Sequence, residues 1–173
     1  MDQINGTIEC AEKKLPIVIF TNFFDACYFI KNKSTILTID DKSYHLHLLE
    51  NPEIFSIAIS SPPKDKLKII YDNYSDIPRL DFFCPTYKLL CQYKEDKDWI
   101  EYEREFIKII SLNKNNIMEW VDSLESNKIY ILMCWENTAG GSNCHRKILY
   151  DKISISKKLK SKAIWIYRHG NEK

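Results

Sequence analysis

The chain has 173 residues, of which 45% are hydrophobic and 13% aromatic, so it carries enough apolar side chains to build a core. Only four Gly and six Pro exclude a collagen-like or low-complexity chain. With 25 basic and 24 acidic residues, the net charge of +1 excludes attraction of a polyanion by the whole molecule. Binding of a phosphate or a nucleic acid would therefore need a local basic patch.

The first 14 residues contain no apolar stretch of the kind found in secretory signals. We expect residues 1–14 to form a mobile leader and residues 15–173 to form a single α/β domain. The longest apolar run, residues 15–20, is too short to cross a bilayer. The six cysteines lack the dense spacing of a disulfide scaffold, which favours free thiols. These features predict a cytoplasmic protein with no membrane contact.

The first apolar run predicts a strand buried on both faces, as in a parallel sheet. This strand ends at Thr21 and Asn22, and Asn22 is placed to cap a helix that begins at Phe23. The apolar residues 54–59 predict a second buried strand. Pro62 and Pro63 lack the backbone N–H that a sheet requires, so the strand should end before them.

Between these two strands, residues 34–51 alternate apolar and polar side chains about a polar turn, which predicts an inserted β-hairpin. A two-stranded hairpin must place its apolar face against something. The candidates are the mouth of a cleft and a second copy of the chain. We favour the second copy, and hence a homodimer, because twofold pairing is the commonest form of oligomer.

The second half continues the alternation of helices and strands. Helical spacing of apolar residues predicts three helices, over residues 86–93, 98–110 and 117–124, and Asp98 is placed to cap the second. Residues 128–134 are the clearest strand, another helix opens at Cys144, and residues 163–167 form a last strand. Strands that alternate with helices favour an α/β layer sandwich with a mostly parallel sheet.

Ligands of open α/β sheets bind beyond the carboxyl ends of the strands, near the positive ends of helices. Polar or reactive side chains stand at the ends of three predicted strands: Thr21 and Asn22, Ser60, and Cys134, Trp135 and Glu136. The helix that opens with Cys144, His145 and Arg146 would point its free N–H groups at the same edge.

This convergence predicts a pocket for an anion, with ligand contacts from Arg146, Thr21, Asn22, Ser60 and Trp135. If the pocket is catalytic, Cys144 or Cys134 is the nucleophile, His145 the base or activating cation, and Glu136 the acid or base. That arrangement would suit a hydrolase or transferase acting on a nucleotide-like substrate. In the alternative interpretation both cysteines are core residues and Arg146 forms a surface ion pair.

The segment Ile131-Leu-Met-Cys-Trp-Glu136, followed by Cys144-His-Arg-Lys-Ile-Leu149, resembles the signature of the domain-of-unknown-function family 488. Residues 19–24, 57–63 and 84–106 are similar to further blocks of that family in the same order, so the resemblance spans roughly residues 17–155. It implies a Rossmann-like α/β domain with a polar site around the Cys-His-Arg element, and it assigns no catalytic residue. The loop at 137–143 and the hairpin at 34–51 depart from the family pattern.

Other motifs are missing. No Walker sequence and no G-x-G-x-x-G follow the first strand. Cys134, Cys144 and His145 are possible zinc ligands, but the chain has no C-x-x-C pair beside them, so the spacing predicts neither a metal nor another cofactor.

The sequence thus favours binding, with or without turnover, of a phosphate-bearing small molecule such as a nucleotide or nucleotide-derived signal. The alternative is a nucleic-acid or protein interaction module without catalysis. This alternative rests on the segment from Arg146 to Arg168, which contains eight basic residues and a single acidic residue, Asp151.

Overall fold

Helices and strands alternate along the chain in the computed structural model, which describes residues 15–39, 42–47, 51–60, 64–136, 138 and 141–169. The predicted leader, residues 1–14, lies outside the described residues. The elements in chain order are β1 (Ile17–Asn22), α1 (Phe23–Asn32), β2 (Ser34–Ile39), β3 (Lys42–His47), β4 (Glu53–Ser56), α2 (Lys68–Asn73), the 3-10 helix η1 (Asp81–Phe83), α3 (Tyr87–Asp96), α4 (Trp99–Leu112), α5 (Lys114–Asp122), β5 (Ile129–Cys134), α6 (His145–Ser154), α7 (Lys157–Lys160) and β6 (Ile164–Tyr167).

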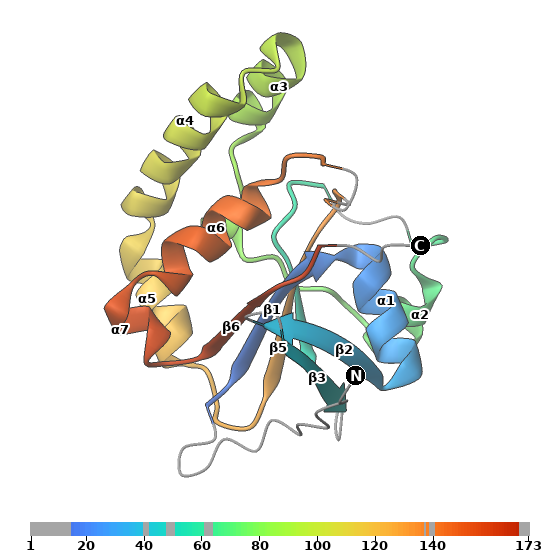
Figure 1. Cartoon of the computed structure of the whole chain (residues 1–173). Helices are drawn as coiled ribbons and strands as arrows, with labels where there is room; N and C mark the ends of the chain where they lie inside the picture. The colour runs from blue at the N-terminus through green and yellow to red at the C-terminus, as the bar shows by residue number, and fades with distance from the viewer. Residues whose placement is uncertain are drawn as a thin grey trace.

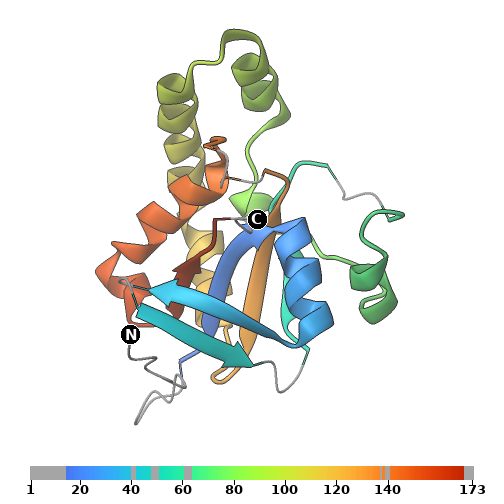
Figure 2. The ribbon, with the colours of Figure 1, turned by 45° about the vertical axis from the view of Figure 1, so that its right-hand side comes forward.

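Four of the strands form one parallel sheet in the order β4-β5-β1-β6. In both views the helices α1 and α2 lie to one side of this sheet and α4 to α7 to the other (Figures 1 and 2). The predicted α/β class with a mostly parallel sheet is therefore confirmed, and the arrangement is that of a Rossmann-like layer. Five residues of β1 and five of β5 are buried, as expected for central strands covered on both faces.

Caps set the places where the helices begin. The side chain of Asn22 accepts a hydrogen bond from the backbone N–H of Asp25 at 2.8 Å, so α1 starts directly at the end of β1. Asp98 accepts one from the N–H of Glu101 at 3.0 Å and starts α4 in the same way. Both caps were predicted from the sequence.

The predicted hairpin is present as the antiparallel pair β2–β3, in which Ser34 pairs with His47. Leu46 of this hairpin is buried and belongs to the main core. The predicted strand at residues 54–59 is shorter than expected and ends at Ser56. The N–H of Ile57 donates a last hydrogen bond to the carbonyl of Met133 in β5, at 2.9 Å. The chain then leaves the sheet, and residues 58–60 line a pocket.

The helices α3 and α4 pack against each other as a hairpin that projects beyond the end of the sheet (Figures 1 and 2). We call this unit the helical arm. Phe106, on the sheet-side half of α4, is fully buried and holds the arm to the core. Across the described residues, every helix is too short or too polar to traverse a lipid bilayer.

Candidate functional site

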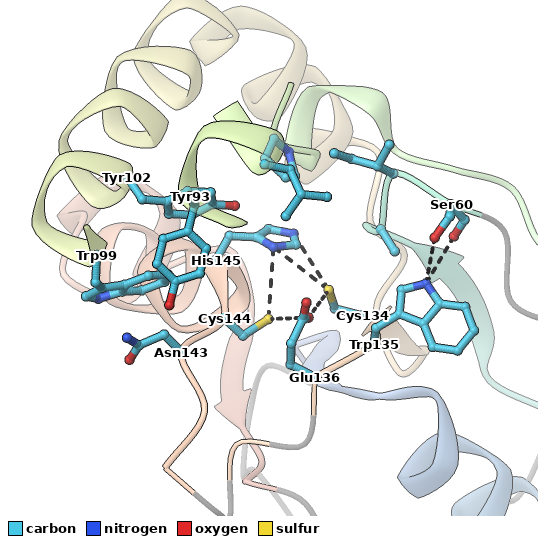
Figure 3. A pocket seen from close by; sticks show the side chains of 14 residues that line it. Ser60, Tyr93, Trp99, Tyr102, Cys134, Trp135, Glu136, Asn143, Cys144 and His145 are labelled. Carbon is cyan, nitrogen blue, oxygen red and sulfur yellow. Dashed lines mark hydrogen bonds between the residues drawn. The ribbon is translucent and has the colours of Figure 1, made fainter. Parts of the chain in front are cut away.

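A pocket lies at the carboxyl ends of β4 and β5, where α6 begins (Figure 3). Its walls come from the segment after β4 (58–60), the end of β5 (134–136), the start of α6 (143–145) and the helical arm. The cavity volume is about 60 Å³, enough for roughly four or five waters. The pocket therefore does not enclose a whole nucleotide.

Four reactive side chains meet at the floor of this pocket, and we call Cys134, Glu136, Cys144 and His145 the thiol cluster (Figure 3). The Sγ atoms of Cys134 and Cys144 lie 3.0 and 3.3 Å from the same carboxylate oxygen, Oε2 of Glu136. The Nδ1 atom of His145 lies 3.8 Å from the Sγ of Cys134 and 4.0 Å from the Sγ of Cys144. The sequence predicted this convergence, since it placed all four residues at one sheet edge.

The ring of His145 is held from two sides. Its Nε2–H donates to the backbone carbonyl of Ile57 at 2.8 Å, so in the neutral ring the free lone pair is on Nδ1. The ring of Phe106 meets it edge to face, with centroids 5.2 Å apart. The chain just after β4 and the helix α4 therefore fix the orientation of the imidazole together.

The two thiols have opposite proton affinities. The hydrogen bond with Cys134, helped by the charges of His145 and Arg146, outweighs burial and holds the pKa of the Cys144 thiol well below its usual range. Burial, together with the hydrogen bond and charge of Cys144, raises the pKa of Cys134. Of the two thiols, Cys144 therefore forms the thiolate more readily.

The other two groups of the cluster respond to this thiolate. Burial and the Cys144 charge raise the pKa of the Glu136 carboxyl. Burial works to lower the pKa of His145, but the Cys144 thiolate and Glu136 outweigh it and raise that pKa. The cluster therefore places a thiol that loses its proton readily beside an imidazole that gains one readily, an arrangement that serves nucleophilic chemistry. With both thiols deprotonated and the imidazole neutral, the same groups can ligate a soft metal ion.

Aromatic side chains of the helical arm form one wall of the pocket, and we call Tyr93, Trp99 and Tyr102 the aromatic wall (Figure 3). The rings of Trp99 and Tyr102 are stacked, with centroids 5.1 Å apart and an angle of 15° between their planes. Tyr93 packs against both, at 5.6 and 5.1 Å. Trp99 and Tyr102 belong to the helical spacing of apolar residues that predicted a helix over residues 98–110, and this face of the helix lines the pocket.

The opposite wall contains two residues that the sequence predicted. Trp135 donates from Nε1 to the hydroxyl of Ser60 at 2.9 Å, and this bond ties the end of β5 to the segment after β4 (Figure 3). The indole also meets the buried ring of Phe23 edge to face, at 5.1 Å. Trp135 is half-buried and Ser60 is exposed, so both can contact a ligand at the pocket mouth.

Thr21 and Asn22 lie at the predicted sheet edge but do not line the pocket. In the sheet Asn22 is level with Cys134, and yet its side chain caps α1. The hydroxyl of Thr21 faces the carboxylate of Asp25 at 3.5 Å. Both side chains are buried and serve the junction between β1 and α1.

Arg146 is fully buried and also lies outside the pocket lining. Its Nη2 donates to the hydroxyl of Thr138 at 3.2 Å, and its guanidinium carbon lies 5.4 Å from the ring centroid of Tyr167 on β6. Among the described residues its Nε and Nη1 atoms have no hydrogen-bond partner. Arg146 follows His145 on α6, so it points about 100° further round the helix, away from the pocket and toward β6.

Comparison of the chain with family models, with curated proteins and with solved structures finds no match. The resemblance to the domain-of-unknown-function family 488 therefore stays a prediction, and the function must be argued from the pocket itself.

Proposed function

We propose that the pocket binds a phosphate-bearing small molecule of the nucleotide type. The observation that carries the proposal is an aromatic wall that faces polar, reactive groups at the carboxyl end of a parallel sheet. This is the usual ligand position in open α/β sheets. Every nucleobase has a flat aromatic face, so any base can stack on aromatic side chains.

The size of the pocket decides how such a ligand would lie. A cavity of 60 Å³ does not enclose a whole nucleotide, so most of such a ligand must lie at the pocket mouth. The mouth is lined by the exposed residues Ser60 and Asn143, and Asn143 stands two residues before the first residue of α6. Phosphate oxygens placed there would approach the positive end of this ten-residue helix.

Calorimetric titration of the protein with nucleosides and with mono-, di- and cyclic nucleotides tests this proposal. Tyr93→Ala and Trp99→Ala should each weaken binding about tenfold, because each removes a stacking surface. Tyr87→Ala is the matched control, since Tyr87 lies on the same helix as Tyr93 but is 71% exposed and outside the pocket. If no nucleotide binds, or if all three variants weaken binding equally, the proposal is wrong.

A second candidate is turnover of the same ligand by Cys144. It is favoured by one observation: Cys144 immediately precedes α6 and reaches the pocket floor beside His145. Incubation of the protein with the nucleotide panel, followed by mass spectrometry, separates the two functions. Depletion of a nucleotide identifies an enzyme, whereas retention followed by intact release on denaturation identifies a binding protein.

A further inference from the structure

The donor atoms of the thiol cluster surround one small volume (Figure 3). The Sγ of Cys134, the Sγ of Cys144 and a ring nitrogen of His145 all lie within 4.8 Å of one another. The Oε2 atom of Glu136 is within 3.3 Å of both sulfurs. Four side chains from two elements thus aim their ligand atoms at a common point.

These separations are close to those of a tetrahedral zinc site. Bonds of about 2.3 Å to sulfur and about 2.1 Å to nitrogen or oxygen place such ligand atoms about 3.6 Å apart. The distances from the two sulfurs to Oε2 of Glu136 and Nδ1 of His145 run from 3.0 to 4.0 Å. An ion could therefore enter with changes of at most about 0.6 Å in these distances.

We propose that Cys134, Cys144 and His145 bind a zinc ion at the floor of the pocket, with Glu136 as the fourth ligand. The proposal goes beyond ligand binding by the pocket. It makes Cys144 a metal ligand in place of the nucleophile of the second candidate function. Two thiolates and an imidazole form a donor set that selects Zn²⁺ over the harder Mg²⁺ and Ca²⁺.

The surroundings of His145 fit this role. Zinc-binding histidines usually donate their other ring N–H to a carbonyl or carboxylate, which fixes the ring and its tautomer. Here Nε2–H donates to the carbonyl of Ile57, so in the neutral ring the free lone pair is on Nδ1. The packing of Phe106 against the ring keeps it in this orientation.

A buried positive charge lies next to the proposed metal site. Two thiolates and one carboxylate around Zn²⁺ leave one net negative charge. Arg146 is the residue next to His145, is fully buried, and has two nitrogens without a hydrogen-bond partner among the described residues. An excess negative charge at the cluster would offset the cost of burying this guanidinium.

The sequence predicted no metal because the ligands lack a C-x-x-C pair. That expectation rested on spacing alone. The fold supplies the proximity instead: β5 ends at Cys134, and α6 starts at His145 beside it. Cys144 therefore lies beside the end of β5, although it is ten residues further along the chain than Cys134.

Elemental analysis of protein expressed with added zinc and purified under reducing conditions without chelators tests the site. We expect one zinc ion per chain. Chelator-treated protein loaded with Co²⁺ should show the intense visible bands of tetrahedral cobalt and a near-ultraviolet thiolate-to-cobalt band. The Co²⁺ spectrum uses the wild-type chain, so it holds even where a variant fails to fold.

Cys134→Ser and Cys144→Ser should each lower zinc affinity by at least tenfold, the loss already seen when supporting groups alone are removed. Cys27→Ser is the control, because Cys27 is a free thiol on α1 outside the cluster. Wild-type protein with neither zinc nor thiolate-to-cobalt bands would overturn the proposal, as would recovery of Cys134 and Cys144 as a disulfide from the reduced preparation.

Nucleotide titration of zinc-loaded and chelator-treated protein keeps the two proposals apart. Stoichiometric zinc without any nucleotide binding would leave the metal site standing and refute the proposed function. Nucleotide binding by protein that takes up no metal would do the reverse.

Discussion

Asn22 was predicted to bind a ligand, and the structure shows it as the cap of α1, so its replacement by Ala should affect stability and leave binding unchanged. The substitution removes the acceptor for the Asp25 N–H, a bond of 2.8 Å in a site that is 1% exposed. Loss of an asparagine cap costs about 1–2 kcal/mol. For a chain of this length that lowers the melting temperature by about 2–8 °C.

Differential scanning calorimetry of the wild type, Asn22→Ala and Asn22→Ser measures this effect. Serine is nearly as good a cap as asparagine, so Asn22→Ser should lose less than half as much stability as Asn22→Ala. Equal losses in the two variants would show that capping is not the role of the side chain. Weaker nucleotide binding by Asn22→Ala, measured well below its melting temperature, would show that Asn22 contacts the ligand.

Three further predictions concern reactivity and assembly. In metal-free protein at neutral pH, iodoacetamide should label Cys144 before Cys134, because the pKa of Cys144 is lowered and that of Cys134 is raised. The variant His145→Gln removes a positive charge beside Cys144, so it should raise the Cys144 pKa and slow the labelling. Peptide mass spectrometry follows the labelling of each cysteine. Deletion of residues 34–50 should convert a homodimer to a monomer in light scattering, and a monomeric wild type would refute the predicted dimer. Charge reversal at Lys157 and Lys158 together should leave nucleotide affinity unchanged, whereas a large loss with steep salt dependence would favour the nucleic-acid alternative.

The sequence predicted the strands and caps well because each depends on local information. An unbroken apolar run such as that of β1 is typical of a strand covered on both faces, and the cap at Asp98 follows from one side chain and the three residues after it. The convergence of Cys134 and Cys144 could also be predicted, since it follows from the parallel order of strands and the start of one helix.

Side-chain directions could not be predicted, because they depend on what packs against each element. Thr21 turns toward α1, and Arg146 turns toward Tyr167 of β6, a residue 21 positions further along the chain. The aromatic wall was missed for a related reason. Trp99 and Tyr102 recur at the spacing of a buried helix face, and this spacing is the same whether the face meets a core or an opening.

The helical arm and the sheet contribute different parts of one pocket. The thiol cluster stands on the sheet and α6, whereas the aromatic wall stands on α3 and α4, which project beyond the sheet. Substitutions of Tyr93 or Trp99 would therefore change this wall without removing the Phe106 contact that orients His145. Over evolutionary time, descendants of this chain could exchange ligands by drift in the arm alone, so similar thiol clusters would be expected beneath quite different walls.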